Sequence, residues 1–179
     1  MSDQLEYGPQ NFSSGLAYPE IPCGRNPKLA AVLMEDYAGN ASELTAVMQY
    51  LYGSWMVREN CPEVYEALKY ISIIEMEHMD ALAEAIMNLG GDPKYITCGG
   101  RKPEQYWNAK AVDYSKARCN ILLSSIGAER AAINRYQQQI QTVGDEAVAA
   151  LLQRIVMDEQ IHLRAFMELY QKYEGGHAE

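Results

Sequence analysis

The sequence predicts an all-α protein, an antiparallel four-helix bundle with one long crossover between its second and third helices. Two observations predict this class. Apolar residues recur with helical periodicity over four long stretches, which prolines and glycines separate. The links within the first and last pairs of stretches are short, whereas the link in the middle is long. The chain is therefore predicted to form two helical hairpins in a single domain.

The N-terminal residues differ from the rest of the chain. Residues 1–26 contain several prolines and glycines and no apolar period, which predicts an extended arm. We expect this arm to wrap a neighbouring subunit. The bundle itself is expected over residues 27–174, and residues 175–179 form a tail.

The first hairpin is bounded by clear helix signals. The first helix is predicted over 27–58, because Asn26 is a cap and Pro27 occupies the first helical position. Gly39 interrupts this helix without ending it. The second helix is predicted over 62–89, from a proline to a pair of glycines.

The second hairpin follows a long crossover at residues 90–114. A third helix is predicted over 115–142, and Gly144 terminates it. Asp145 is the expected cap of a fourth helix that reaches about residue 173.

Two Glu-x-x-His tetrads lie inside these helices. Residues three apart share one helix face, so each tetrad presents a carboxylate and an imidazole to the same interior point. Each tetrad also has another glutamate about thirty residues upstream, which makes two matching halves. The predicted metal ligands are Glu43, Glu75, His78, Glu129, Glu159 and His162.

The chemistry of these six side chains favours a dinuclear metal site over a purely structural polar cluster. Ionised carboxylates in an apolar core cost several kcal/mol each unless they are neutralised. Two divalent cations neutralise four carboxylates, and mixed oxygen and nitrogen donors suit iron or manganese. Glu77 lies on the opposite side of its helix and is expected to face solvent.

Three further residues are expected to contact the ligands. Tyr50 and Tyr136 lie two turns after the upstream glutamates, where each phenol can donate to a ligand carboxylate of the opposite hairpin. Simple core packing is the alternative for both. Asp158 is expected to orient the imidazole of His78, whereas the first tetrad has Ile74 at the matching position. The two metal positions should therefore differ in their surroundings.

Composition excludes several classes of function. The net charge of −9, without any lysine or arginine block, argues against nucleic acid and anionic membranes. No apolar run is long enough to span a bilayer, and the first residues do not form a signal peptide. We expect a soluble cytoplasmic protein. Its four cysteines form no Cys-x-x-Cys motif, so we expect free thiols.

The motifs resemble the ferritin-like di-metal superfamily over the four helices. The tetrad from Glu75 to His78 and the segment from Asp158 to His162 are similar to those of bacterioferritin, and Tyr50 falls where its site tyrosine does. The stretch from Tyr18 to Ala46 instead resembles manganese catalases of the spore-coat type. Rubrerythrin is less similar, because its additional carboxylate is replaced by Ala132.

The resemblance implies three functions. The first is a di-iron oxidoreductase that acts on peroxide or dioxygen with an unknown reductant. The second is a dimanganese catalase, in which Glu159 would be a base rather than a ligand. The third is a non-enzymatic metal-binding protein of a coat or store.

Two further expectations concern haem and self-association. In bacterioferritin the methionine of the tetrad binds haem, but Met76 is also an ordinary filler of a helix face, and we expect no haem. Tyrosine-rich helix faces and the arm predict at least a homodimer.

Overall fold

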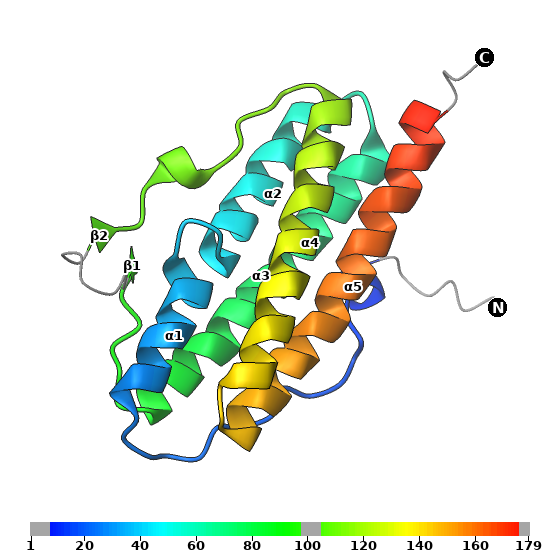
Figure 1. Cartoon of the computed structure of the whole chain (residues 1–179). Helices are drawn as coiled ribbons and strands as arrows, with labels where there is room; N and C mark the ends of the chain where they lie inside the picture. Colours follow the sequence, from blue (N-terminus) through cyan, green and yellow to red (C-terminus); the bar gives the residue numbers. More distant parts are fainter. Residues whose placement is uncertain (1–7, 98–104, 176–179) are drawn as a thin grey trace.

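The computed structural model describes residues 8–97 and 105–175, and its centre is a bundle of long helices (Figure 1). In the first hairpin α2 packs against α3, and in the second α4 packs against α5. A long crossover joins the hairpins, as predicted, and carries the short antiparallel strands β1 (Ile96–Thr97) and β2 (Gln105–Tyr106) and the 3₁₀ turn η2 (Ala109–Ala111). The helices are α1 (Pro27–Ala38), α2 (Glu43–Val57), α3 (Pro62–Asn88), α4 (Arg118–Thr142) and α5 (Glu146–Glu174).

The prediction of one continuous first helix over 27–58 is wrong. The helix breaks between Gly39 and Ser42, which separates α1 from α2. The amide of Gly39 closes the last turn of α1 by donating to the carbonyl of Glu35 at 3.0 Å. The hydroxyl of Ser42 accepts from the amide of Thr45 at 3.3 Å and caps α2. Because of this break, α2 starts at the first of the predicted ligands.

The remaining helix ends follow from local signals. Pro62 occupies the first turn of α3, where its missing N–H costs no hydrogen bond. Gly144 has a φ of +67°, a conformation that favours glycine, and it separates α4 from α5. The carboxylate of Asp145 then accepts from the amides of Ala147 and Val148 at 3.1 and 3.0 Å.

The core consists of two apolar clusters with a polar layer at their junction. One cluster, which includes Leu33, Leu82 and Leu152, also holds Tyr136. The other, built around Ile71 and Phe166, also holds Tyr50. Both tyrosines reach the buried acidic side chains that the two clusters enclose.

The N-terminal arm, expected to wrap a neighbouring subunit, lies on its own bundle. Its described part, from residue 8, includes the 3₁₀ turn η1 (Pro9–Phe12) against α3 and α5, then passes round the lower end of the bundle in Figure 1 to enter α1. Its last part is fixed by the amide of Gly24, which donates to the carbonyl of Asn88 at 3.0 Å. The side-chain amide of Asn88 in turn donates to the carbonyl of Ile21 at 3.0 Å.

Two smaller observations concern the described residues alone. Within these ranges none of the helices combines the length and the apolarity that crossing a lipid bilayer requires. Cys23, Cys61 and Cys119 are free thiols, and Cys98 lies outside the described part of the chain.

Candidate metal centre

All six predicted ligands meet at one buried point in the middle of the bundle. The helices α2 and α4 contribute one glutamate each, whereas α3 and α5 contribute one tetrad each. None of these residues is more than 2% exposed. They fall into two overlapping groups of four, whose possible ligand atoms lie within 4.8 Å of one another: Glu43, Glu75, His78 and Glu159, and Glu75, Glu129, Glu159 and His162.

The first group is centred on Nδ1 of His78. This nitrogen lies 2.9 Å from Oε2 of Glu75, 3.3 Å from Oε1 of Glu159 and 3.5 Å from Oε2 of Glu43. All three carboxylates come from different helices, so the group joins both hairpins.

The second group is centred on Nδ1 of His162. This nitrogen lies 3.2 Å from Oε1 of Glu75, 3.6 Å from Oε2 of Glu159 and 3.9 Å from Oε1 of Glu129. Glu75 and Glu159 thus offer one oxygen to each histidine. Two shared carboxylates between two histidine positions is the arrangement that a carboxylate-bridged metal pair requires.

The side chains fit a pair of metal ions. Oε1 of Glu75, Oε1 of Glu159 and Nδ1 of His162 are buried without a hydrogen-bond partner among the described residues, although they lie close together. Buried polar atoms without partners are costly, and here they converge on one another. Two divalent cations would satisfy these atoms and neutralise four carboxylates, and the donor set suits iron or manganese.

Without metal, the cluster retains protons. Burial, together with Glu159 and Glu75, raises the pKa of Glu43 well above its usual value. Burial and Glu159 have the same effect on the pKa of Glu129. Burial opposes charge on His162, but Glu75 and Glu159 outweigh it and raise its pKa to about 9. Protons therefore occupy the cluster where cations could bind.

Both tyrosines donate to carboxylates of the opposite hairpin, as the sequence suggested. The hydroxyl of Tyr50 on α2 donates to Oε1 of Glu129 on α4 at 2.5 Å. The hydroxyl of Tyr136 on α4 donates to Oε1 of Glu43 on α2. Burial raises the pKa of both phenols well above the usual value, so they remain neutral donors.

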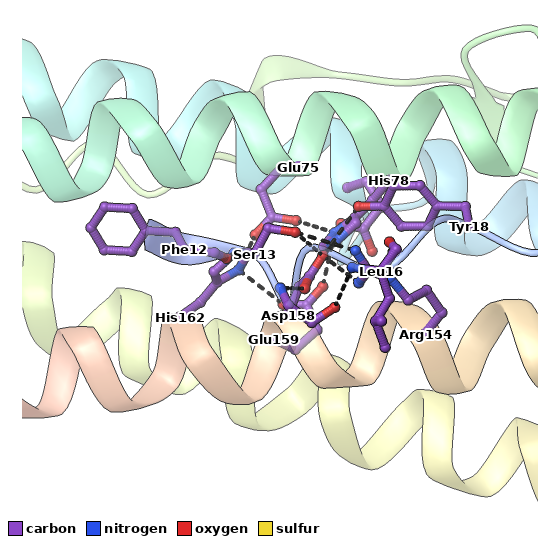
Figure 2. A network of polar contacts seen from close by, with 12 residues as sticks. Phe12, Ser13, Leu16, Tyr18, Glu75, His78, Arg154, Asp158, Glu159 and His162 are labelled. Carbon is purple, nitrogen blue, oxygen red and sulfur yellow. Dashed lines mark hydrogen bonds and ion pairs between the residues drawn. The ribbon is translucent and has the colours of Figure 1, made fainter. Parts of the chain in front are cut away.

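The outer nitrogens of the two histidines have different partners (Figure 2). Nε2 of His78 lies 3.2 Å from Oδ2 of Asp158, the residue that the sequence placed there. Nε2 of His162 donates to the backbone carbonyl of Phe12 at 3.0 Å. Sequence reasoning missed this carbonyl, because a backbone acceptor in an arm leaves no residue-type signal. The only hint was Ile74, which meant that the second imidazole needed a different partner.

Asp158 itself is the centre of a network that the sequence did not reveal. It forms an ion pair with Arg154 at 2.6 Å and accepts from the amide of Ser14 at 2.6 Å and the hydroxyl of Tyr18 at 3.1 Å. Burial opposes its charge, but the hydrogen bonds from His78, Ser14 and Arg154 outweigh burial and lower its pKa. A charged Asp158 can only accept, so His78 presents Nδ1 to the carboxylates.

Two other residues of the first tetrad lie outside the cluster. Glu77 is exposed, as predicted. Met76 is 44% exposed on the outer face of α3, where it lines a groove with Tyr37 and Tyr95.

A small cavity reaches the cluster from the α2 and α4 side. Its volume is about 70 Å³, which is room for a few water-sized molecules. Ala128, Ala131 and Ala132 form its α4 wall, and Arg135 and Gln49 also line it. Four of the predicted ligands also line it, namely Glu43, Glu75, Glu129 and Glu159, and α2 with its cap adds Ser42, Thr45, Ala46 and Tyr50.

A bundle of antiparallel helices around two Glu-x-x-His tetrads defines the class of dinuclear carboxylate proteins. Comparison with known proteins agrees with this class. The family model of the ferritin-like domain matches residues 40–175, and the chain belongs to this family.

Individual relatives divide between two kinds of protein. A probable manganese catalase of Clostridium acetobutylicum is 26% identical over 167 residues, which is 84% of this chain and 73% of the relative. A bacterioferritin of Desulfovibrio desulfuricans is 30% identical over 143 residues, which is 78% of this chain and 74% of the relative.

Solved structures divide in the same way. KatB, a manganese catalase from Anabaena, superposes with a TM-score of 0.79 at 23% identity, covering 89% of this chain and 78% of KatB. The bacterioferritin of D. desulfuricans superposes with a TM-score of 0.68 at 29% identity, covering 83% of this chain and 82% of that one. That bacterioferritin contains a diiron site.

Proposed function

We propose that this protein is a non-haem di-iron oxidoreductase that acts on peroxide or dioxygen. The observation that carries the proposal is the pair of shared carboxylates, Glu75 and Glu159, each with one oxygen at His78 and one at His162. A purely structural polar cluster would satisfy its own atoms, whereas this one leaves three buried atoms without hydrogen bonds among the described residues.

The six ligands form three pairs in this proposal. His78 and Glu43 would hold one iron ion, His162 and Glu129 would hold the other, and Glu75 and Glu159 would be shared by the two. The pair of ions, when bound, supplies two electrons by cycling between the +2 and +3 states. The chain contributes carboxylates that can change between bridging and terminal binding as the charge changes. Tyr50 and Tyr136 hold the two terminal carboxylates in place.

The cavity supports a small substrate. A volume of about 70 Å³ admits peroxide or dioxygen and excludes a larger organic molecule. Its alanine wall presents no donor or acceptor side chain, and the polar groups lie elsewhere in the lining, on the ligand carboxylates, Arg135, Gln49, Ser42, Thr45 and Tyr50. The small volume of the cavity therefore limits the size of the substrate, and these polar groups can bind one that is as polar as peroxide.

A dimanganese catalase is the second candidate. It is favoured because the similarity to the probable manganese catalase extends over 84% of this chain. Catalase chemistry converts two hydrogen peroxide molecules into two waters and one dioxygen, so peroxide is both oxidised and reduced and no external donor is needed. In this candidate Glu159 would serve as a base beside the metals rather than as a ligand.

Metal analysis combined with a peroxide assay separates these functions. Protein isolated from its native host should contain two iron ions per chain and consume peroxide or dioxygen only when an electron donor is present. Two manganese ions, with dioxygen released from peroxide without a donor, would establish the catalase. Bound metal without any turnover would contradict both and leave a metal-binding or storage protein.

We also propose that the protein forms at least a homodimer. Several large apolar side chains lie on helix surfaces, including Trp55 at 60% exposure, Met76 and Met48. The arm contributes less to this argument than expected, because it packs on its own bundle. A monodisperse monomer in light scattering at micromolar concentration would contradict the proposal.

A further inference from the structure

The arm covers the side of the metal centre that lies away from the cavity. The cavity opens between α2 and α4, whereas η1 packs against α3 and α5. Phe12, at 4% exposure, fixes this turn in the second apolar cluster, and its ring stacks on Tyr70 with 6.4 Å between centroids. The arm therefore covers the metal centre on the α3 and α5 side, opposite the cavity.

One atom of the arm contacts a predicted ligand directly. The carbonyl of Phe12 can only accept, so Nε2 of His162 must carry the proton of their 3.0 Å hydrogen bond. That leaves Nδ1 of His162 to face the carboxylates of Glu75, Glu159 and Glu129. Docking of the arm thus selects the imidazole orientation that can bind metal.

Other groups of the arm contact Asp158, which in turn contacts His78 (Figure 2). The amide of Ser14 and the hydroxyl of Tyr18 donate to the same carboxylate that holds Nε2 of His78. With the hydroxyl of Ser13 and the guanidinium of Arg154, five groups lie within 3.4 Å of this buried carboxylate and leave it little freedom to rotate. Because Nε2 of His78 contacts this carboxylate, the orientation of the imidazole is fixed as well.

Arg154 ties the arm to this carboxylate. Its side chain is only 5% exposed and pairs with Asp158 at 2.6 Å. Its Nε donates to the carbonyl of Leu16 at 2.7 Å, and its terminal nitrogen donates to the hydroxyl of Ser13 at 3.2 Å. The guanidinium also lies over the ring of Tyr18, 4.4 Å from its centroid.

We propose that the N-terminal arm is a positioning element of the metal centre, and that docking of residues 8–18 and retention of metal stabilise one another. The inference rests on the proposed metal site. Its physical basis is reciprocal coupling, because an arm that fixes the metal-binding orientation of the imidazoles must itself be held more firmly when metal is bound.

The two metal positions should depend on the arm unequally. His78 keeps Asp158, a residue of α5, whether or not the arm is docked. His162 loses its Nε2 acceptor as soon as Phe12 leaves. Release of the arm should therefore free the ion at His162 first, one ion per chain.

Metal release from Phe12 variants tests this order. Chains loaded with two manganese(II) ions would be mixed with excess chelator, and the ions released per chain followed over time. Loss of a partner that orients a metal-bound histidine typically costs 10- to 100-fold in affinity, so Phe12→Ala should release one ion roughly 10- to 100-fold faster than the wild type. Phe12→Leu keeps an apolar anchor and should restore slow release.

A matched control removes buried apolar volume elsewhere. Ile96 is buried in β1, which packs against α1 and β2, whereas η1 packs against α3 and α5, so Ile96→Ala should release both ions at the wild-type rate. Equal release from Phe12→Ala and the wild type would overturn the proposal. Fast release of both ions from Ile96→Ala as well would also overturn it, because general destabilisation would then explain the effect.

Hydrogen exchange in the wild-type chain provides a second test that needs no variant. The amide of Ser14 is bonded to Asp158, so peptides from residues 8–18 should exchange at least about tenfold more slowly after manganese loading. Identical exchange with and without metal would contradict the coupling. If the wild type binds fewer than two ions per chain, both the proposed function and the inference are contradicted. If it binds two ions but the exchange of residues 8–18 does not change, only the inference is contradicted.

Discussion

Glu43 and Glu129 are the ligands whose substitution gives the simplest test of the metal site. Each belongs to one of the two ligand groups only, whereas Glu75 and Glu159 belong to both. Each is also the first ligand of its hairpin along the chain. Their substitution should therefore weaken the site without removing a shared carboxylate.

Replacing Glu43 or Glu129 by alanine should leave the helices formed but lower the metal content below two ions per chain. One terminal carboxyl group is lost, and the cost of burying this polar group is lost with it, so folding itself is not impaired. Circular dichroism and elemental analysis measure the two effects. Full occupancy in both variants would contradict the ligand assignment.

The tyrosines allow a sharper test at the same scale. Tyr50→Phe and Tyr136→Phe keep the packing volume but remove the hydroxyls that donate to Glu129 and Glu43. A tyrosine that only packs should cost about 1 kcal/mol of stability and leave turnover unchanged. We expect altered turnover or self-oxidation of the protein, with both ions still bound. Unchanged kinetics in both variants, with both metal ions bound, would show that these tyrosines only pack in the core.

Sequence patterns could predict the side chains of the buried cluster because residue identity and helical spacing carried the signal. The tetrads, the upstream glutamates and Asp158 all came from residue type at a fixed spacing on a helix face. The partner of His162 could not be found in this way. It is a backbone carbonyl 150 positions away in sequence, and every residue type offers that group.

At the scale of elements, strong local signals in the sequence located three helices correctly. The weaker signal at the break between α1 and α2 was misinterpreted. Pro62 and Asp145 marked the starts of α3 and α5 correctly. The break between Gly39 and Ser42 was missed because the apolar period continues across it and no proline interrupts it. The docking of the arm was missed for a different reason, since its contacts are long-range and mostly made by backbone atoms.

The α4 wall of the cavity provides a prediction about access. Ala132→Leu adds bulk to a cavity of about 70 Å³ without replacing a predicted ligand. Metal content should stay at two ions per chain, whereas peroxide turnover should fall at least about tenfold, because the small-molecule path is filled. Ala150→Leu, at an exposed position of α5, is the control and should keep wild-type turnover. Equal turnover in the two variants would mean that substrate enters elsewhere.

At the scale of the whole molecule, metal uptake should depend on pH. His162 has a pKa of about 9 in the metal-free protein, and the pKa values of His78, Glu43 and Glu129 are also raised. Metal binding requires deprotonated ligands, so each ion must displace protons. The apparent affinity should therefore rise with pH up to about 9. Titration calorimetry at pH 7 in two buffers of different ionisation enthalpy would measure the released protons, and the absence of release would contradict this account of the metal-free cluster.

The most direct test of the whole account is an anomalous difference map from crystals of the manganese-loaded protein. Two peaks per chain are expected inside the bundle, roughly 3.5–4 Å apart as in other dinuclear sites. One peak should lie beside Nδ1 of His78 and the other beside Nδ1 of His162, with Glu75 and Glu159 between them. A single peak, or metal bound only at surface carboxylates, would contradict the dinuclear centre.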